Sequence, residues 1–217
     1  MDASNEKNTV LEENKKLTDI LRWLKSSDLM NKSGIQGRFR EASFEKWDEA
    51  LSGQKKAGLF ARNYVNAFRD VRAAGRSAVF VGNTGTGKTY LASAIGLELI
   101  RHGYTVRYTT AFNAFVQFRK TLRSGSDHKS ESQFIAELAS SHLLILDEAW
   151  GSFCKETERE MEILFHILDH RYTAKLPSIL ISHLPTSDLR QFLSDRVSDR
   201  LNENGLDVVA FDWTSRR

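Results

Sequence analysis

From residue 77 onward, short apolar runs alternate with longer stretches in which apolar residues recur at helical spacing. The runs predict five strands, at Ser77–Val81, Thr105–Thr109, His142–Leu146, Ser178–Ser182 and Asp207–Asp212. The stretches between them predict five helices, at residues 88–102, 111–123, 131–140, 156–173 and 186–201. Such alternation is typical of a parallel sheet that is covered by helices on both faces. We therefore predict an α/β fold.

A short amphipathic helix is predicted near the N-terminus. Leu17, Ile20, Leu21 and Leu24 follow the i, i+3, i+4, i+7 spacing of one helix face, and Trp23 lies beside them. Because so short a helix is not stable alone in water, we expect its apolar face to dock on this protein or on a partner.

A polar break at residues 33–37, which holds two glycines, divides the chain. We expect residues 1–32 to form an N-terminal helical extension and residues 33–217 to form the main domain. Within that domain, residues 44–74 are predicted to be mostly helical. Their candidate core positions are Leu59, Tyr64, Phe68 and Val71.

The first predicted strand leads directly into a glycine-rich loop. This loop matches the phosphate-binding pattern G-x-x-x-x-G-K-[ST] with Gly82, Asn83, Thr84, Gly85, Thr86, Gly87, Lys88 and Thr89. Glycines let the backbone curl closely around phosphate oxygens, and the helix that follows adds its positive N-terminal end. We expect Lys88 to reach the β- and γ-phosphates of ATP and the Thr89 hydroxyl to ligate Mg²⁺. The alternative is a turn that matches by chance, which the flanking strand and helix disfavour.

The third predicted strand ends in two acids, Asp147 and Glu148. Beside a phosphate-binding loop, the first acid is expected to hold Mg²⁺ through its water shell. The second is expected to orient and deprotonate the water that attacks the γ-phosphate. The alternative is that the two acids only cap the turn after the strand. A second carboxylate for water activation favours hydrolysis over phosphoryl transfer to a small molecule.

Composition and charge change this picture little. The 217 residues are 41% hydrophobic and 27% charged, the normal balance of a soluble protein. We see neither an apolar run long enough to span a bilayer nor a secretory signal, so we expect a cytoplasmic protein. The single cysteine, Cys154, excludes an intramolecular disulfide. The net charge is +3, and residues 31–76 carry a local basic excess that suits either nucleic acid or a solvated face.

Two predicted helices, rather than the single crossover helix that a minimal fold needs, separate the second strand from the third. Phe112, Phe115 and Phe118 lie on the first of them at i, i+3, i+6, a spacing that fits core packing or base stacking. The basic residues that follow could bind DNA or only offset the helix dipole. They are Arg119, Lys120 and Arg123.

Taken together, these segments resemble the AAA+ ATPases of the DnaC/IstB family. The resemblance runs from about residue 33 to the end of the chain. It rests on the phosphate-binding loop and on Ser33–Ile35, Ala42–Phe44, Leu144–Glu148, Ile181–Pro185, Asp195–Leu201 and Phe211–Arg216. The motifs Arg-Val-x-Asp-Arg and Phe-x-Trp-x-Ser look closer to the DnaC-type replicative helicase loaders than to the IstB-type transposition helpers.

The resemblance implies that the nucleotide lies at a subunit interface, where a neighbouring copy supplies an arginine to the γ-phosphate. The matching residue is Arg196, with Arg200 one helical turn further on. A guanidinium supplied in this way stabilises charge that develops during hydrolysis. The alternative is that both arginines pair with Asp195 and Asp199 on a solvated helix. The resemblance also implies that the segment around Arg119 lines a path for single-stranded DNA.

Two departures from the family pattern stand out. Asparagine usually occupies the tip of the fourth strand, where it helps to position the attacking water, and His183 takes that place here. Histidine titrates near neutrality, so hydrolysis could be slow or pH-dependent; alternatively, His183 only caps the strand. The helical region before residue 33 is also shorter than the one with which DnaC loaders bind the replicative helicase, a reduction that suits a phage or mobile element. We further expect no helical lid after the last strand.

The leading hypothesis is an ATP-hydrolysing helicase loader that acts on single-stranded DNA and binds a replicative helicase. The first alternative is an IstB-like transposition helper that binds duplex DNA. The second is a small-molecule phosphotransferase that uses the same loop, which should keep an arginine-bearing lid.

Overall fold

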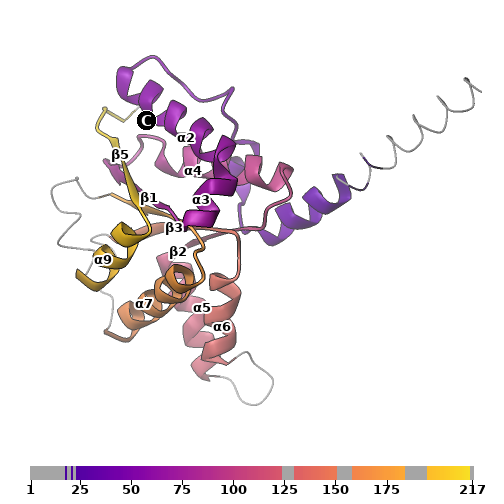
Figure 1. Ribbon diagram of the computed structural model, residues 1–217, viewed down its shortest axis with the longest axis vertical. Helices are drawn as coiled ribbons and strands as arrows, with labels where there is room; N and C mark the ends of the chain where they lie inside the picture. Colours follow the sequence, from indigo (N-terminus) through magenta and orange to yellow (C-terminus); the bar gives the residue numbers. More distant parts are fainter. Residues whose placement is uncertain are drawn as a thin grey trace, which may run out of the picture.

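A parallel sheet forms the centre of the molecule (Figure 1). It has five strands in the order β2-β3-β4-β1-β5. The strands are β1 (Ser77–Gly82), β2 (Val106–Thr110), β3 (Leu143–Trp150), β4 (Ser178–Ser182) and β5 (Leu206–Phe211). The computed structural model describes residues 18, 21, 23–123, 130–150, 158–183 and 195–215. The predicted α/β fold with a parallel sheet is therefore confirmed.

Helices cover both faces of the sheet (Figure 1). One face carries α2 (Ser52–Asn66), α3 (Phe68–Ala74) and α4 (Lys88–Arg101). The other carries α5 (Ala111–Arg123), α6 (Glu131–Ala139), α7 (Glu158–Thr173) and α9 (Asp195–Glu203). Successive residues of β1 serve the two layers in turn: Ala78 and Phe80 pack toward α4, whereas Val79 and Val81 pack toward α5 and α7. Because a central parallel strand is buried on both faces, its sequence is continuously apolar.

Local sequence signals set several of the boundaries. Gly75 ends α3 in the left-handed conformation, with φ of 75°. Ser130 caps α6, since its hydroxyl accepts the backbone N–H of Gln133 while the Gln133 side chain accepts the Ser130 N–H. A short 3-10 helix, η1 (Gly37–Glu41), precedes α2 and packs on α4. The chain folds back in this way so that η1 lies close to the loop that starts α4.

Residues 44–74 are mostly helical, as predicted, because they contain α2 and α3, although residues 44–51 form turns and irregular chain. One predicted core position in this segment is wrong. Leu59 is 58% exposed because it lies on the outer side of α2, whereas Tyr64, Phe68 and Val71 are buried as predicted. Residues 23–32 are helical, and the side chains of Leu21, Trp23 and Leu24 are exposed in this chain. Leu17, Ile20 and Cys154 lie outside the described residues.

Helices α5 and α6 both connect β2 to β3; α5 packs on the sheet, and α6 packs on α5 and α7. Phe115 and Phe118 are buried in the core, where the Phe118 ring meets that of Phe134, so the core interpretation holds for these two residues. Phe112 is 55% exposed. In the last crossover, residues 186–194 of the predicted helix lie outside the described residues, and α9 begins at Asp195. No helix in the described part of the chain is long and apolar enough to cross a membrane.

Candidate active site

The glycine-rich loop joins the end of β1 to the start of α4, and its glycines are required by the structure behind it. Gly82 has φ of 126°, and a Cβ there would lie 2.3 Å from the Phe211 carbonyl oxygen. Gly87 has φ of 97°, and a Cβ there would lie 2.7 Å from the ring of Trp47. Only glycine tolerates both the left-handed backbone and the close approach. The segments of this chain around Phe211 and Trp47 therefore fix the curvature of the loop.

A cluster of three aromatic residues, Trp47, Phe211 and Trp213, packs against the loop. Trp213, just beyond β5, donates its indole N–H to the backbone carbonyl of Thr86, 3.1 Å away. Its ring lies 5.0 Å from that of Phe211 and 6.3 Å from that of Trp47. The C-terminal end of the described chain thus holds the loop by a direct hydrogen bond.

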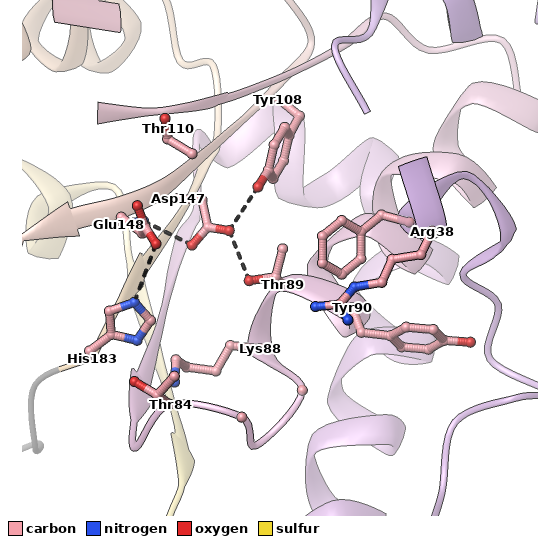
Figure 2. Close-up of a pocket in the computed structure, with 13 residues that line it drawn as sticks. Arg38, Thr84, Lys88, Thr89, Tyr90, Tyr108, Thr110, Asp147, Glu148 and His183 are labelled. Atoms are coloured by element: carbon pink, nitrogen blue, oxygen red, sulfur yellow. Dashed lines mark hydrogen bonds and ion pairs between the residues drawn. The ribbon is translucent and has the colours of Figure 1, made fainter. Parts of the chain in front are cut away.

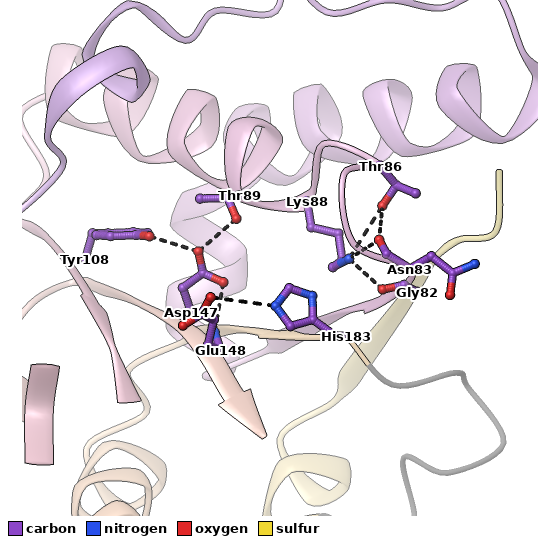
Figure 3. Close-up of polar contacts among 9 residues, drawn as sticks. All are labelled: Gly82, Asn83, Thr86, Lys88, Thr89, Tyr108, Asp147, Glu148 and His183. Atoms are coloured by element: carbon purple, nitrogen blue, oxygen red, sulfur yellow. Dashed lines mark hydrogen bonds and ion pairs between the residues drawn. The ribbon is translucent and has the colours of Figure 1, made fainter. Parts of the chain in front are cut away.

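Lys88 is buried at the base of the loop (Figure 3). Its ammonium nitrogen donates to the carbonyl oxygens of Gly82, at 2.6 Å, and Asn83, at 2.7 Å. Burial lowers the pKa of Lys88 to about 8, although the negative charge of Asp147 acts in the opposite direction. A cation held in this way, with only neutral acceptors within hydrogen-bond distance among the described residues, is well suited to receive an anion.

Asp147 lies opposite the loop and accepts three hydrogen bonds (Figures 2 and 3). Its Oδ2 atom accepts from the Thr89 hydroxyl and from the Tyr108 hydroxyl, each at 2.8 Å. Its Oδ1 atom accepts from the backbone N–H of Glu148, at 2.8 Å. Parallel pairing of β2 with β3 sets Thr110 beside Asp147 and so brings Tyr108 within reach. Burial, and then the charge of Asp147, raises the pKa of Tyr108, so its hydroxyl stays a neutral donor.

Glu148, in β3, and His183, directly after β4, face each other (Figure 2). The Oε1 atom of Glu148 lies 3.8 Å from Nε2 of His183. Glu148 has φ of 51°, a left-handed conformation that costs a residue of its type on the order of 1–3 kcal/mol. Backbone strain of this kind is concentrated at functional sites. His183 Nδ1 is buried and has no hydrogen-bond partner among the described residues.

These residues surround one cavity of about 540 Å³. It is lined by Arg38, Phe39, Thr84, Gly85, Gly87, Lys88, Thr89, Tyr90, Tyr108, Thr110, Asp147, Glu148 and His183. The loop and both acids, which the sequence singled out, therefore meet in space with His183. Sequence reasoning missed Arg38, Phe39 and Tyr108, because η1 and β2 reach the cavity only through tertiary packing. It also missed Tyr90, although this residue directly follows the loop in α4. The only sequence signal that could have pointed to η1 as part of the site was the cationic Arg38 next to the aromatic Phe39.

The predicted basic residues lie elsewhere or are only partly described. Arg196 falls in α9, but its side chain lies outside the described residues, as does that of Arg123. Arg119 and Lys120 are exposed on α5 and do not line the cavity. Arg200 is not on a solvated face: it forms an ion pair with Asp169 of α7.

Comparisons with known proteins agree with this geometry. A family model of IstB-like ATP-binding proteins matches residues 41–207. The chain belongs to this family. It is 31% identical over 209 residues to the replicative helicase loader DnaC of Buchnera aphidicola (subsp. Schizaphis graminum), covering 96% of this chain and 80% of the relative. It is 32% identical over 196 residues to the replicative helicase loader DnaC of Escherichia coli K12, covering 90% and 77%.

Solved structures show the same fold for this DnaC/IstB-family chain. A crystal structure of the DnaC helicase loader superposes with a TM-score of 0.68 at 20% identity, over 81% of this chain and 99% of that one. DnaA from Aquifex aeolicus, solved with bound AMPPCP, superposes with a TM-score of 0.64 at 24% identity, over 82% and 51%. The fold is therefore that of the AAA+ P-loop ATPases, as predicted.

Proposed function

We propose that this protein is an ATP-hydrolysing helicase loader of DNA replication, with ATP and Mg²⁺ bound in the cavity between the loop and β3. The loader role rests on the similarity to DnaC proteins along most of both chains. The nucleotide site rests on one observation above all: the 2.8 Å hydrogen bond between Thr89 Oγ1 and Asp147 Oδ2, formed directly beside the buried Lys88.

The residues present fit a triphosphate. Backbone N–H groups at the start of α4 and the positive end of this helix favour an anion. Lys88 can exchange its neutral carbonyl acceptors for phosphate oxygens at little cost, since its ammonium group is already desolvated. We assign the loop, Gly82 to Thr89, to phosphate binding.

Thr89 and Asp147 fit Mg²⁺. A hydroxyl and a carboxylate are hard oxygen donors of the kind that this ion prefers, and it usually keeps several waters. When bound, the ion neutralises charge on the phosphate groups. We propose that Thr89 ligates it directly and that Asp147 orients its water shell.

We assign Glu148 to the activation of the attacking water. Its carboxylate is more than half exposed at the mouth of the cavity, beside His183. As a general base it would take one proton from the water as the water oxygen bonds to the γ-phosphorus, while the bond from that phosphorus to the β–γ bridging oxygen breaks and ADP leaves. While the Glu148 carboxylate pairs with His183, it is less available to accept a proton from the water. We therefore infer that His183 affects both the availability of this carboxylate and the position of the water.

We also propose that hydrolysis needs a second copy of the chain. Arg196 would act on a neighbour's nucleotide, as an arginine finger does. Support comes from the anchoring of its helix: the Arg200 guanidinium lies 5.1 Å from the ring centroid of Phe165 and 5.6 Å from that of Tyr172, both on α7. A helix attached in this way can present a side chain to another subunit without itself moving.

The partners follow from the same reasoning. We propose that residues 1–32 form a partner-binding extension to the ATPase domain at residues 33–217. The exposed apolar side chains of Leu21, Trp23 and Leu24 suit contact with the replicative helicase. We propose that α5 contacts single-stranded DNA through Arg119, Lys120 and Arg123.

Helicase loading on a forked DNA substrate tests this function directly. With ATP, the protein should increase unwinding by the host's replicative helicase, whereas Lys88→Ala should not. The family match also favours a second candidate, an IstB-like transposition helper. Preferential binding of duplex over single-stranded DNA at several salt concentrations, together with no effect on the helicase, would support that candidate instead.

A further inference from the structure

Tyr108 connects two parts of the molecule, one through its backbone and one through its side chain. Its backbone N–H donates to the carbonyl oxygen of Ser33, 2.6 Å away. Its hydroxyl donates to Oδ2 of Asp147, 2.8 Å away. Because β2 is an edge strand, one side of its backbone is available for this contact with Ser33.

The contact with Ser33 belongs to a tightly built junction, residues 32–35, that ends the N-terminal helix. The Ser33 hydroxyl donates to the carbonyl of Met30 at 2.7 Å and accepts the N–H of Ile35 at 3.1 Å. Ser33 is fully buried. One residue before Tyr108, the guanidinium of Arg107 donates to the carbonyl of Lys32 at 2.9 Å. The end of the N-terminal helix is therefore attached to β2 at two successive residues.

Gly34 makes the junction sensitive to small changes. It has φ of 80°, and a Cβ at this position would lie 2.4 Å from the carbonyl oxygen of Tyr108. No larger side chain fits there unless the junction and β2 separate. A displacement of the junction would thus act first on the backbone of Tyr108.

We propose that Tyr108 is a positioning residue for Asp147, and that the junction couples the N-terminal helix to the metal site through it. This inference rests on the proposed function, since it takes Asp147 as the residue that orients the water shell of Mg²⁺. Thr89 and Tyr108 donate to the same carboxylate oxygen. When the Thr89 oxygen turns to the metal, the Tyr108 hydroxyl still holds the carboxylate in place. A partner that pulls on the helix at residues 23–32 would shift Tyr108 and loosen this hold.

The first test is Tyr108→Phe in the full chain, read out as the Mg²⁺ dependence of binding a fluorescent, non-hydrolysable ATP analogue. Hydrogen bonds to charged groups are strong enough that losing this one should raise the Mg²⁺ concentration for half-maximal binding about tenfold. Tyr64→Phe is the matched control, because the buried Tyr64 hydroxyl donates to the Arg76 carbonyl far from the cavity. That variant should lower the melting temperature and leave the Mg²⁺ dependence unchanged.

The second test addresses the coupling. Gly34→Ala should raise the Mg²⁺ requirement in the otherwise unchanged protein and have little effect in the Tyr108→Phe background. Gly37→Ala is its control, since Gly37 also has a positive φ, of 58°, but a Cβ there meets nothing within 4 Å. If Gly34→Ala does not fold, Ser33→Ala removes the two side-chain hydrogen bonds of the junction more gently. Effects of Gly34→Ala and Tyr108→Phe that simply add would overturn the coupling.

The outcomes separate this inference from the function on which it rests. If the unaltered protein binds the analogue with no need for Mg²⁺, the proposed metal site itself is wrong. If the unaltered protein shows a normal Mg²⁺ dependence but Tyr108→Phe leaves it unchanged, or makes Mg²⁺ bind more tightly, only the positioning role is overturned.

Discussion

His183 Nε2 lies 3.8 Å from Oε1 of Glu148, so the imidazole at the end of β4 draws the proposed water-activating carboxylate toward itself. This contact joins β3 to the residue that follows β4, and it involves Glu148, whose backbone is strained. A protonated imidazole would hold the carboxylate more strongly than a neutral one. We therefore expect the contact with His183 to slow hydrolysis by holding the Glu148 carboxylate away from the attacking water.

His183→Asn should relieve this restraint. Asparagine keeps a hydrogen-bond donor at the strand end but cannot become charged, so we expect turnover that is preserved or raised. Steady-state rates at saturating ATP, compared between the unaltered protein and the variant, provide the measurement. An unchanged rate would leave His183 as a residue that only caps β4.

Glu148→Gln and Asp147→Asn should have different consequences. The first removes only the general base, so we expect normal ATP affinity with turnover reduced at least about 100-fold. The second weakens the acceptor of the Thr89 and Tyr108 hydroxyls, so the Mg²⁺ requirement should rise. Equilibrium binding and single-turnover hydrolysis separate the two effects. Small and equal effects would point to structural roles for both acids.

Lys88→Met should strongly weaken ATP binding without destabilising the fold. The ammonium group is buried among neutral acceptors, and its removal takes away a desolvated charge. We therefore expect the free energy of unfolding to stay the same or rise, while affinity for ATP falls at least about 100-fold. Denaturant unfolding and analogue titration on the same sample check both statements. A variant that binds ATP normally would show that the loop is not the phosphate site.

Trp213→Phe should weaken ATP binding several-fold, because the loop loses the hydrogen bond at the Thr86 carbonyl while an aromatic ring remains. Trp47→Phe is the matched comparison. The Trp47 indole N–H donates to the carbonyl of Gln54 in α2 rather than to the loop. Equal losses of affinity in the two variants would mean that general packing, and not this hydrogen bond, shapes the loop.

Stability should fall as the pH drops below about 6.5, the usual value for histidine. Burial lowers the pKa of His142, with smaller contributions from Arg72 and Arg171, and its Nδ1 accepts the N–H of Thr105 at 3.0 Å. The folded protein therefore binds a proton here less readily than the unfolded chain. The stability that the neutral imidazole contributes is fully present above the pKa of His142 in the unfolded chain, and it is lost as the pH falls below that value. Melting temperatures of the protein and of His142→Asn should converge toward acidic pH.

The position of the glycine-rich loop beside the two acids could be predicted because each is a contiguous signal that follows an apolar run. The sheet could be predicted for the same reason, and its strands begin within one residue of their expected positions. β3 runs past the two acids to Trp150 because it continues to pair with β4 beyond a shift in register. Arg38, Phe39 and Tyr108 could not be assigned to the site, since segments distant in the chain bring them there. The prediction that Leu59 belongs to the core was wrong, because helical spacing alone does not tell which side of a helix meets the sheet.

The junction at Ser33 and Gly34 also bears on solubility. An edge strand with free backbone groups can pair with the same strand of another molecule, and proteins commonly cover such edges. In this protein the Ser33 carbonyl accepts the backbone N–H of Tyr108, so this donor on the edge of β2 is not free to pair with another strand. A fragment that begins after residue 35 would leave this edge open to strand exchange between molecules. We expect such a fragment to aggregate more readily than the whole chain, even though every residue of the cavity would still be present.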